Sequence, residues 1–182
     1  MNILDVDVKL NISRKSGDFV VPIELTLPKD TEIAERIVKD NLLVDSMSPR
    51  FTGLRFRNYI MYSLSLDSLT KMSKKISDAI NEDEHGYHKL VFMSKTFNVN
   101  PINALKFMDN IVFHDGKTAG AVLKEKWVDG EITDEEIEDY IDFERMADES
   151  DDYTETPDGV FEFWDISPDE DDNRLLSDND FQ

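Results

Sequence analysis

The first hydrophobic pattern along the chain is a strict alternation of apolar and polar residues. In "DVDVKLNI" (residues 5–12) every second residue is apolar, and "FVVPIELTL" (residues 19–27) follows after a segment that contains Gly17. Two such runs around a glycine-containing turn predict a β-hairpin. Because proline cannot donate to a strand ladder, Pro22 places the second strand at a sheet edge or a bulge.

A second pattern, with apolar residues three and four positions apart, predicts helices over residues 30–41 and 66–80. Residues 88–97 ("HKLVFMSKTF") fit either a helix or a strand. Asn100 followed by Pro101 predicts another helix start, because asparagine caps a first turn that proline fits.

The chain then continues as a short strand, "NIVFHDG" (residues 110–116), and a helix over residues 117–127 that ends at "VDG". Further on, Pro157, Asp158 and Gly159 form a turn signal between two strand-like runs, which predicts a second hairpin. The alternation of both element types predicts an α+β fold made of small mixed subdomains.

These patterns predict four parts. Residues 1–60 form a β-rich N-terminal subdomain with a hairpin, and residues 61–128 form a middle α/β subdomain. Residues 129–165 form an acidic helix followed by a hairpin, and residues 166–182 have the composition of a disordered acidic tail.

The charge of the chain lies almost entirely in its last third. The 182 residues carry a net charge of −20, and residues 129–182 hold 23 acidic and two basic residues. Residues 1–128 are nearly neutral, with 17 acidic and 18 basic residues. This balance argues against a conventional nucleic-acid-binding protein, which needs an excess of Lys and Arg.

The segment "EITDEEIEDYIDFERMADESDDY" (residues 131–153) begins with a capping box, Thr133 and Glu136, and contains apolar residues at helical spacing. We therefore expect a docked helix over residues 134–149, with an outward acidic stripe of Glu135, Glu138, Asp139, Asp142 and Glu149. Residues 134–149 contain nine acids and one arginine. Over a helix of about 24 Å this is roughly one charge per 3 Å, close to the spacing of about 3.4 Å along one DNA strand.

Several kinds of chemistry are excluded or weakly indicated. The absence of cysteine excludes disulfides and thiolate metal sites. A calcium loop over residues 169–174 fails because Arg174 stands where glycine is required. His85, His88 and His114 are too few and too scattered to predict a metal site. We expect no enzyme activity, no cofactor and no metal.

One basic and aromatic cluster, Arg50, Arg55 and Arg57 with Phe51 and Phe56, lies on a predicted strand. It fits either edge-strand arginines that extend over a core or a secondary basic face for an anionic partner. The N-terminus lacks the features of a signal peptide, and no apolar run reaches the length of a membrane span. We expect a soluble protein in the cytoplasm of a bacterial host.

The C-terminal part resembles the ArdA antirestriction family. The similarity lies in "YIDFERMA" (residues 140–147), followed after an acidic spacer by "DGVFEFW" (residues 158–164), and in the layout of residues 100–132. Members of that family are acidic, often dimeric proteins of phages and mobile elements that imitate B-form DNA and occupy the DNA-binding groove of type I restriction-modification enzymes. The resemblance implies the same class of partner here.

We therefore expect an anti-defence protein that acts as a DNA mimic. The alternatives are an anti-CRISPR protein, whose target has a similarly basic channel, and a phage interaction or assembly protein without inhibitory activity. A homodimer and direct DNA binding stay open, the latter as the less favoured. The expected mimic surface consists of Asp134, Glu135, Glu138, Asp139, Asp142, Glu149, Asp151, Asp152, Glu155 and Glu162.

Overall fold

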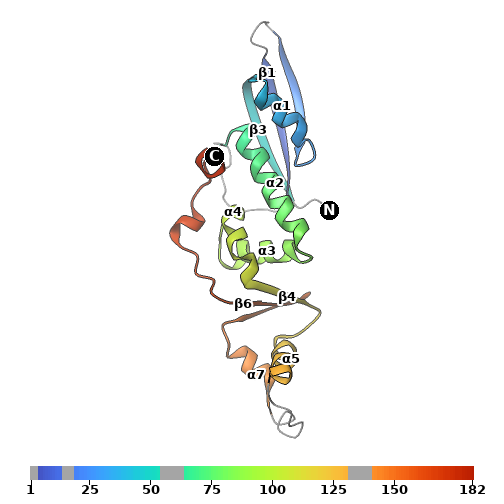
Figure 1. Cartoon of the computed structure of the whole chain (residues 1–182), viewed down its shortest axis with the longest axis vertical. Coiled ribbons are helices and arrows are strands. Elements are labelled where there is room, and N and C mark those ends of the chain that lie inside the picture. Colours follow the sequence, from blue (N-terminus) through green and yellow to red (C-terminus); the bar gives the residue numbers. More distant parts are fainter. Residues whose placement is uncertain (1–3, 14–18, 54–63, 131–140) are drawn as a thin grey trace. The chain divides into compact units, whose positions relative to one another are not determined.

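The chain folds into helices and antiparallel sheets, so the predicted α+β class is confirmed. The computed structural model describes residues 4–13, 19–53, 64–130 and 141–182. The chain divides into two compact units. Unit 1 consists of residues 1–106 and 168–182, and unit 2 consists of residues 107–167 (Figure 1).

Unit 1 contains a three-stranded sheet of β1 (Leu4–Ser13), β2 (Val20–Leu27) and β3 (Leu43–Gly53), in the order β2-β1-β3. Strands β1 and β2 pair antiparallel, which confirms the predicted hairpin, and β2 is an edge strand as Pro22 indicated. The other edge strand, β3, carries Pro49. A proline in each edge strand removes a donor that another chain could pair with, which protects both edges from strand addition.

Helices α1 (Thr31–Lys39) and α2 (Leu66–Glu82) confirm the two helices predicted from apolar spacing. They lie side by side over one face of the sheet (Figure 1). The apolar residues that alternate along β1 are buried on this face: Val6, Val8, Leu10 and Ile12. Burial of these side chains and of the apolar stripe of α2 forms the core of unit 1.

Three further helical elements follow α2 along the chain. Helix α3 (Gly86–Thr96) shows that the undecided residues 88–97 form a helix, followed by α4 (Pro101–Ala104) and the 3-10 helix η2 (Leu105–Asn110). Asn100 caps α4, since its side chain accepts a hydrogen bond of 2.9 Å from the amide of Asn103, as predicted.

The described residues of unit 2 form a second three-stranded sheet that is packed against helices. Strands β4 (Ile111–Asp115), β5 (Tyr153–Thr156) and β6 (Gly159–Phe163) lie in the order β4-β6-β5, which confirms the predicted strand and hairpin. Helices α5 (Ala119–Gly130) and α7 (Phe143–Asp148) lie side by side and pack on β6 through Ala119, Val122, Ala147 and Val160.

Two backbone features hold β4 and β6 close together. Gly159 has a φ of 153°, and a side chain there would collide with the carbonyl of His114 on the neighbouring strand. The amide of Trp164 donates to the carbonyl of Asn110 at 3.1 Å, next to the pair Ile111 and Phe163. The chain therefore enters and leaves unit 2 through two adjacent, hydrogen-bonded segments.

The predicted disorder of residues 166–182 is wrong for the part that we call the C-terminal strap, residues 168–182. This strap forms the 3-10 helices η3 (Glu170–Asn173) and η4 (Asp178–Phe181), which contact α4 and α2. Leu176 and Phe181 are buried. The composition is that of a solvated tail, but two apolar side chains and well-placed acidic caps are enough to dock it.

Hydrogen bonds tie the strap to two helix starts. The Asp178 carboxylate accepts from the amide of Ser65 at 2.8 Å, at the start of α2. The carbonyl of Asp172 accepts from the Asn100 side chain at 2.9 Å, at the start of α4, and the Asp172 carboxylate pairs with Lys106 at 2.9 Å. The strap therefore belongs to unit 1, and the predicted boundaries at residues 60, 128 and 165 do not coincide with the two units.

Two carboxyl groups of the strap, those of Asp178 and Asp180, have lowered pKa values. Hydrogen bonding to Arg174 lowers the pKa of Asp180 to about 2. Hydrogen bonds from Ser68 and Ser65 lower the pKa of Asp178. A carboxyl group with a lowered pKa in the folded state stabilises that state above its unfolded pKa of about 3.9 and loses this contribution as the pH falls.

We therefore predict that the strap loses stability between about pH 4 and pH 2, the window between the unfolded pKa and the folded pKa of Asp180. The expected result is a loss of protection for the amide of Ser177, which donates to Asp180 at 2.7 Å. Hydrogen exchange followed by NMR across this range measures it. Unchanged protection of this amide at pH 2, with unit 1 still folded, would contradict the prediction.

Candidate partner-binding surface

A run of exposed carboxylates covers one part of unit 2. The acidic segment, residues 142–152, consists of α7 and the turn into β5 and has Arg145 as its one basic residue. Its six acidic residues are all exposed: Asp142, Glu144, Asp148, Glu149, Asp151 and Asp152. Unit 2 as a whole holds 20 acidic and four basic residues, a net charge of −16, so most of the charge of the chain lies here.

Four residues of the expected mimic surface fall in this segment. They are Asp142, Glu149, Asp151 and Asp152, and all four are exposed as expected. Four others lie outside the described residues: Asp134, Glu135, Glu138 and Asp139. The remaining two, Glu155 and Glu162, lie on the sheet and have different surroundings.

The continuous helix predicted over residues 134–149 is wrong, because α7 begins only at Phe143 and Ile141 and Asp142 are not helical. Asp142 is the N-cap, and its side chain accepts from the amide of Arg145 at 3.1 Å. Aspartate is a good cap and a poor interior helix residue, so a helix start at this position is favoured. The comparison with DNA therefore applies to a surface rather than to one straight helix.

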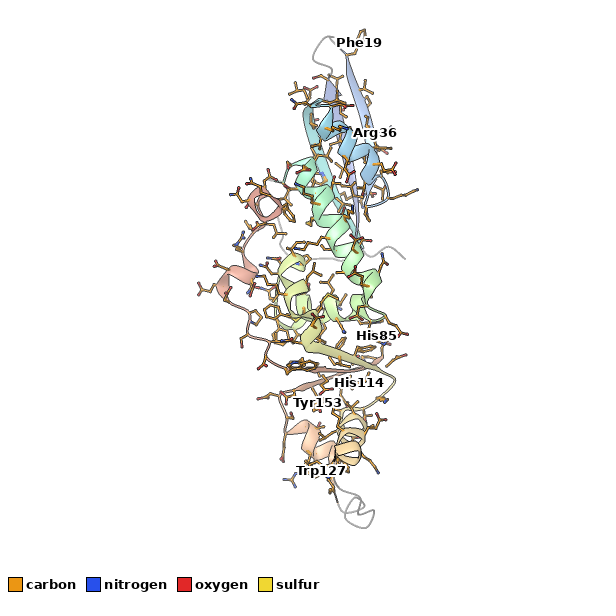
Figure 2. The ribbon with its side chains drawn as sticks, in the orientation of Figure 1. Phe19, Arg36, His85, His114, Trp127 and Tyr153 are labelled. Atoms are coloured by element: carbon orange, nitrogen blue, oxygen red, sulfur yellow. The ribbon has the colours of Figure 1, made fainter. Side chains whose placement is uncertain are left out.

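Apolar contacts fix α7 on α5. The ring of Phe143 packs edge-on against Trp127, with 6.3 Å between the ring centres, and Ala147 belongs to the buried cluster under α5. Figure 2 labels Trp127 on α5 together with His114 and Tyr153 on the strands of unit 2. Phe143 and Ala147 thus face inward, while Asp148 and Glu149 after them are exposed to solvent.

Two carboxylates of unit 2 bind the start of α5. Glu155 on β5 accepts a hydrogen bond of 2.7 Å from the amide of Ala119, the first residue of α5. Glu144 on α7 accepts one of 2.8 Å from the hydroxyl of Thr118. Anionic groups are favourable at a helix N-terminus because they satisfy free amides and interact with the helix dipole. Glu155 is exposed, yet one of its oxygens is engaged in this contact.

Glu162 is not part of an exposed acidic surface, so that expectation is wrong. The residue is only 7% exposed. One of its oxygens lies 3.1 Å from Nε2 of His114, and the other forms an ion pair with Lys126 of α5. In the sheet register Glu162 lies opposite Tyr153 and two residues from Val160, on the face that α5 covers.

The surroundings of Glu162 also affect the pKa of the nearby Tyr153. Burial, together with the charges of Glu162 and Asp152, raises the pKa of the Tyr153 hydroxyl. A buried carboxylate needs such partners, because an unpaired charge in an apolar environment is costly. The sequence does contain a signal for this burial. Side chains two positions apart on a strand point to the same face, so Glu162 shares the face of the apolar residue Val160.

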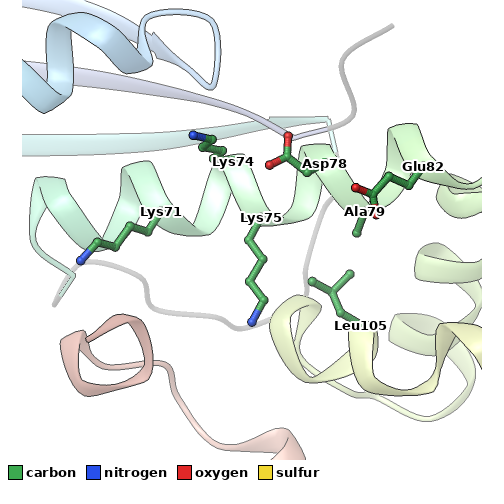
Figure 3. A pocket seen from close by; sticks show the side chains of 7 residues that line it. All are labelled: Lys71, Lys74, Lys75, Asp78, Ala79, Glu82 and Leu105. Atoms are coloured by element: carbon green, nitrogen blue, oxygen red, sulfur yellow. The ribbon is translucent and has the colours of Figure 1, made fainter.

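Of the three arginines of the predicted secondary basic face, the structure describes Arg50. Arg50 is exposed on β3, opposite Asp7 of β1, and Arg55 and Arg57 lie outside the described residues. A different basic group lies on α2, where a groove of about 470 Å³ is lined by Lys71, Lys74, Lys75, Asp78, Ala79, Glu82 and Leu105 (Figure 3). Lys71 is paired with Asp67 at 2.7 Å, and acidic residues line the same groove, so this face has mixed charge.

Within the described residues, no group of three or more His, Asp or Glu side chains is arranged to hold a metal ion. The described part of the chain also has no helix that is both long and apolar enough to cross a membrane. The acidic run at residues 169–172 is engaged in the strap, where Asp169 and Asp172 form a capping box.

Comparison of the sequence with models of known protein families gives no match, and comparison with curated proteins gives none either. The similarity to the ArdA family therefore rests on the quoted motif and on the layout of residues 100–132.

We predict that Glu162→Gln lowers the free energy of unfolding of unit 2 by about 1–2 kcal/mol, because it removes the charge that holds Lys126 and His114. Both tryptophans of the chain, Trp127 and Trp164, lie in unit 2, so tryptophan fluorescence during urea unfolding reports on this unit.

The matched control is Glu125→Gln on α5, the helix that carries Lys126. Glu125 pairs with Lys117 at 2.6 Å, but its side chain is 58% exposed, and an exposed pair contributes about 0–1 kcal/mol. If both variants lower the stability equally, Glu162 has no special structural role.

Proposed function

We propose that this chain is an anti-defence protein of a phage or mobile element that inhibits a DNA-binding nuclease of the bacterial host by occupying its DNA site. The observation that carries the proposal is the acidic segment, in which six exposed carboxylates occur within residues 142–152 against one arginine. The protein would act without catalysis and without a cofactor, in the cytoplasm of the host cell.

Electrostatics support this choice of partner. A DNA duplex presents closely spaced negative charges, and nuclease channels bind them with Lys and Arg. The acidic segment carries six carboxylates within eleven residues, a density of negative charge that resembles the charged backbone of DNA. A surface of this kind would also steer association over long range.

The resemblance to the ArdA family favours a type I restriction-modification enzyme as the target. A CRISPR effector nuclease is the second candidate, because its heteroduplex channel is also positively charged. The same acidic segment would serve in both cases, and a homodimer is compatible with either target.

The target class can be identified by affinity capture. A tagged full-length chain incubated with lysates that contain a type I restriction enzyme or a CRISPR effector should retain one of the two complexes. Retention should fall steeply between low and moderate salt, because charged contacts are screened. Capture of neither complex, with no inhibition of DNA cleavage in either purified system, would contradict the proposal.

We further predict that the double reversal Asp148→Lys and Asp151→Lys weakens inhibition of the captured nuclease about tenfold or more. The side chains of these two residues make no hydrogen bond or ion pair within the described residues, so their replacement should leave the fold intact. DNA-cleavage assays against inhibitor concentration measure the effect.

The control is the double reversal Glu32→Lys and Glu35→Lys on α1 of unit 1. Both residues are exposed, and the change in net charge is identical. Equal loss of inhibition in the two double variants would mean that total charge, and not the acidic segment, determines binding.

A further inference from the structure

Helix α7 cannot be stable by itself. It has six residues, whereas isolated helices shorter than about 12–15 residues are marginal in water. Its acidic side chains also repel one another, and among the described residues Arg145 compensates locally by pairing with Glu149 at 3.0 Å. The position of the acidic segment therefore depends on contacts between α7 and the rest of unit 2.

Glu144 differs from the other acids of the segment because it faces α5. Its Oε1 accepts the hydroxyl of Thr118 at 2.8 Å, directly before the start of α5. Its carboxylate also lies against the backbone of Gly120 in the first turn of that helix. The contact joins the two helices at the end of α5 where the dipole favours a negative charge.

The absence of a side chain at position 120 makes this contact possible. A Cβ atom at Gly120 would lie closer than 3.0 Å to the carboxylate of Glu144. Alanine is otherwise preferred over glycine in a helix, by about fivefold in local stability. Gly120 is also buried, so the close approach of Glu144 explains why glycine suits this position.

We propose that Glu144 is a positioning residue of the acidic segment and not one of its binding charges. By holding α7 on Thr118 and Gly120, Glu144 sets the direction in which Asp142, Asp148 and Glu149 face. This inference rests on the proposed function, because it assigns separate roles to the carboxylates of one surface. Phe143 and Ala147 supply the apolar part of the same contact.

The test compares four variants of the full-length chain: Glu144→Gln, Glu144→Ala, Gly120→Ala and Asp148→Asn. Glutamine keeps an oxygen that can accept from Thr118 but removes the charge, whereas Gly120→Ala displaces the Glu144 carboxylate without changing the charge. Asp148→Asn removes a displayed charge for comparison.

Two quantities are measured for each variant. The first is hydrogen exchange of the α7 amides. The second is the affinity for a fluorescent ten-residue oligolysine peptide across a salt series, from which the slope of log affinity against log salt is obtained. The slope depends on the number of charges in contact and not on stability.

For a positioning residue we expect Glu144→Gln to keep the α7 protection, the oligolysine affinity within about twofold and the salt slope unchanged. Glu144→Ala and Gly120→Ala should increase α7 exchange about fivefold, as expected for the loss of one hydrogen bond, and should weaken binding. Asp148→Asn should reduce the slope without affecting exchange.

Two outcomes would overturn the proposal. Glu144→Gln could reduce the slope as Asp148→Asn does, with exchange unchanged, which would make Glu144 a displayed charge. Alternatively, Gly120→Ala could slow α7 exchange, as expected if the carboxylate is not held there. Neither readout requires a nuclease, so a chain that fails to inhibit any DNA enzyme can still pass this test.

Discussion

Repulsion among the carboxylates of unit 2 is the constraint on which the rest of that unit depends. With 20 acidic and four basic residues in 61 positions, this unit has few cations with which to balance its charge. The fold responds by directing three carboxylates, Glu144, Glu155 and Glu162, toward α5. They come from α7, β5 and β6, so each supporting element contributes one contact. The other acids of unit 2 whose burial the structure describes are exposed, where water screens them.

The motif that resembles the ArdA family acquires a structural explanation from these contacts. Asp142 caps α7, Phe143 packs on Trp127, Glu144 contacts α5 and Ala147 is buried. In the second half of the motif, Gly159 permits a close approach of two strands, and Val160 and Phe161 are buried. These residues build the frame of unit 2. The other exposed acids of the acidic segment lie beside them, at positions the motif does not specify: Asp148, Glu149, Asp151 and Asp152.

Much of the fold could be predicted from the sequence because its elements have strong local signals. The alternation along β1 and β2, the apolar spacing of α2 and the cap at Asn100 each determine a local conformation. Predictions failed where the position of a side chain depends on a contact with a residue far away in the sequence. Nothing near Glu162 in the sequence reveals Lys126, and nothing near Asp178 reveals the amide of Ser65. The helix start at Asp142 does not stand out in the sequence, because the capping box of Thr133 and Glu136 precedes it in the same acid-rich stretch.

The C-terminal strap has a consequence for the order in which the protein is assembled during synthesis. Unit 2 is complete once residue 167 has been made, and its entry and exit segments are already joined between Asn110 and Trp164. Unit 1 still lacks the carboxylate that binds the start of α2 and the carbonyl that receives the Asn100 side chain. These arrive with the last 15 residues of the chain, residues 168–182. Unit 2 is thus inserted within the sequence of unit 1, and the strap contacts of unit 1 can form only after residues 107–167 have been synthesised.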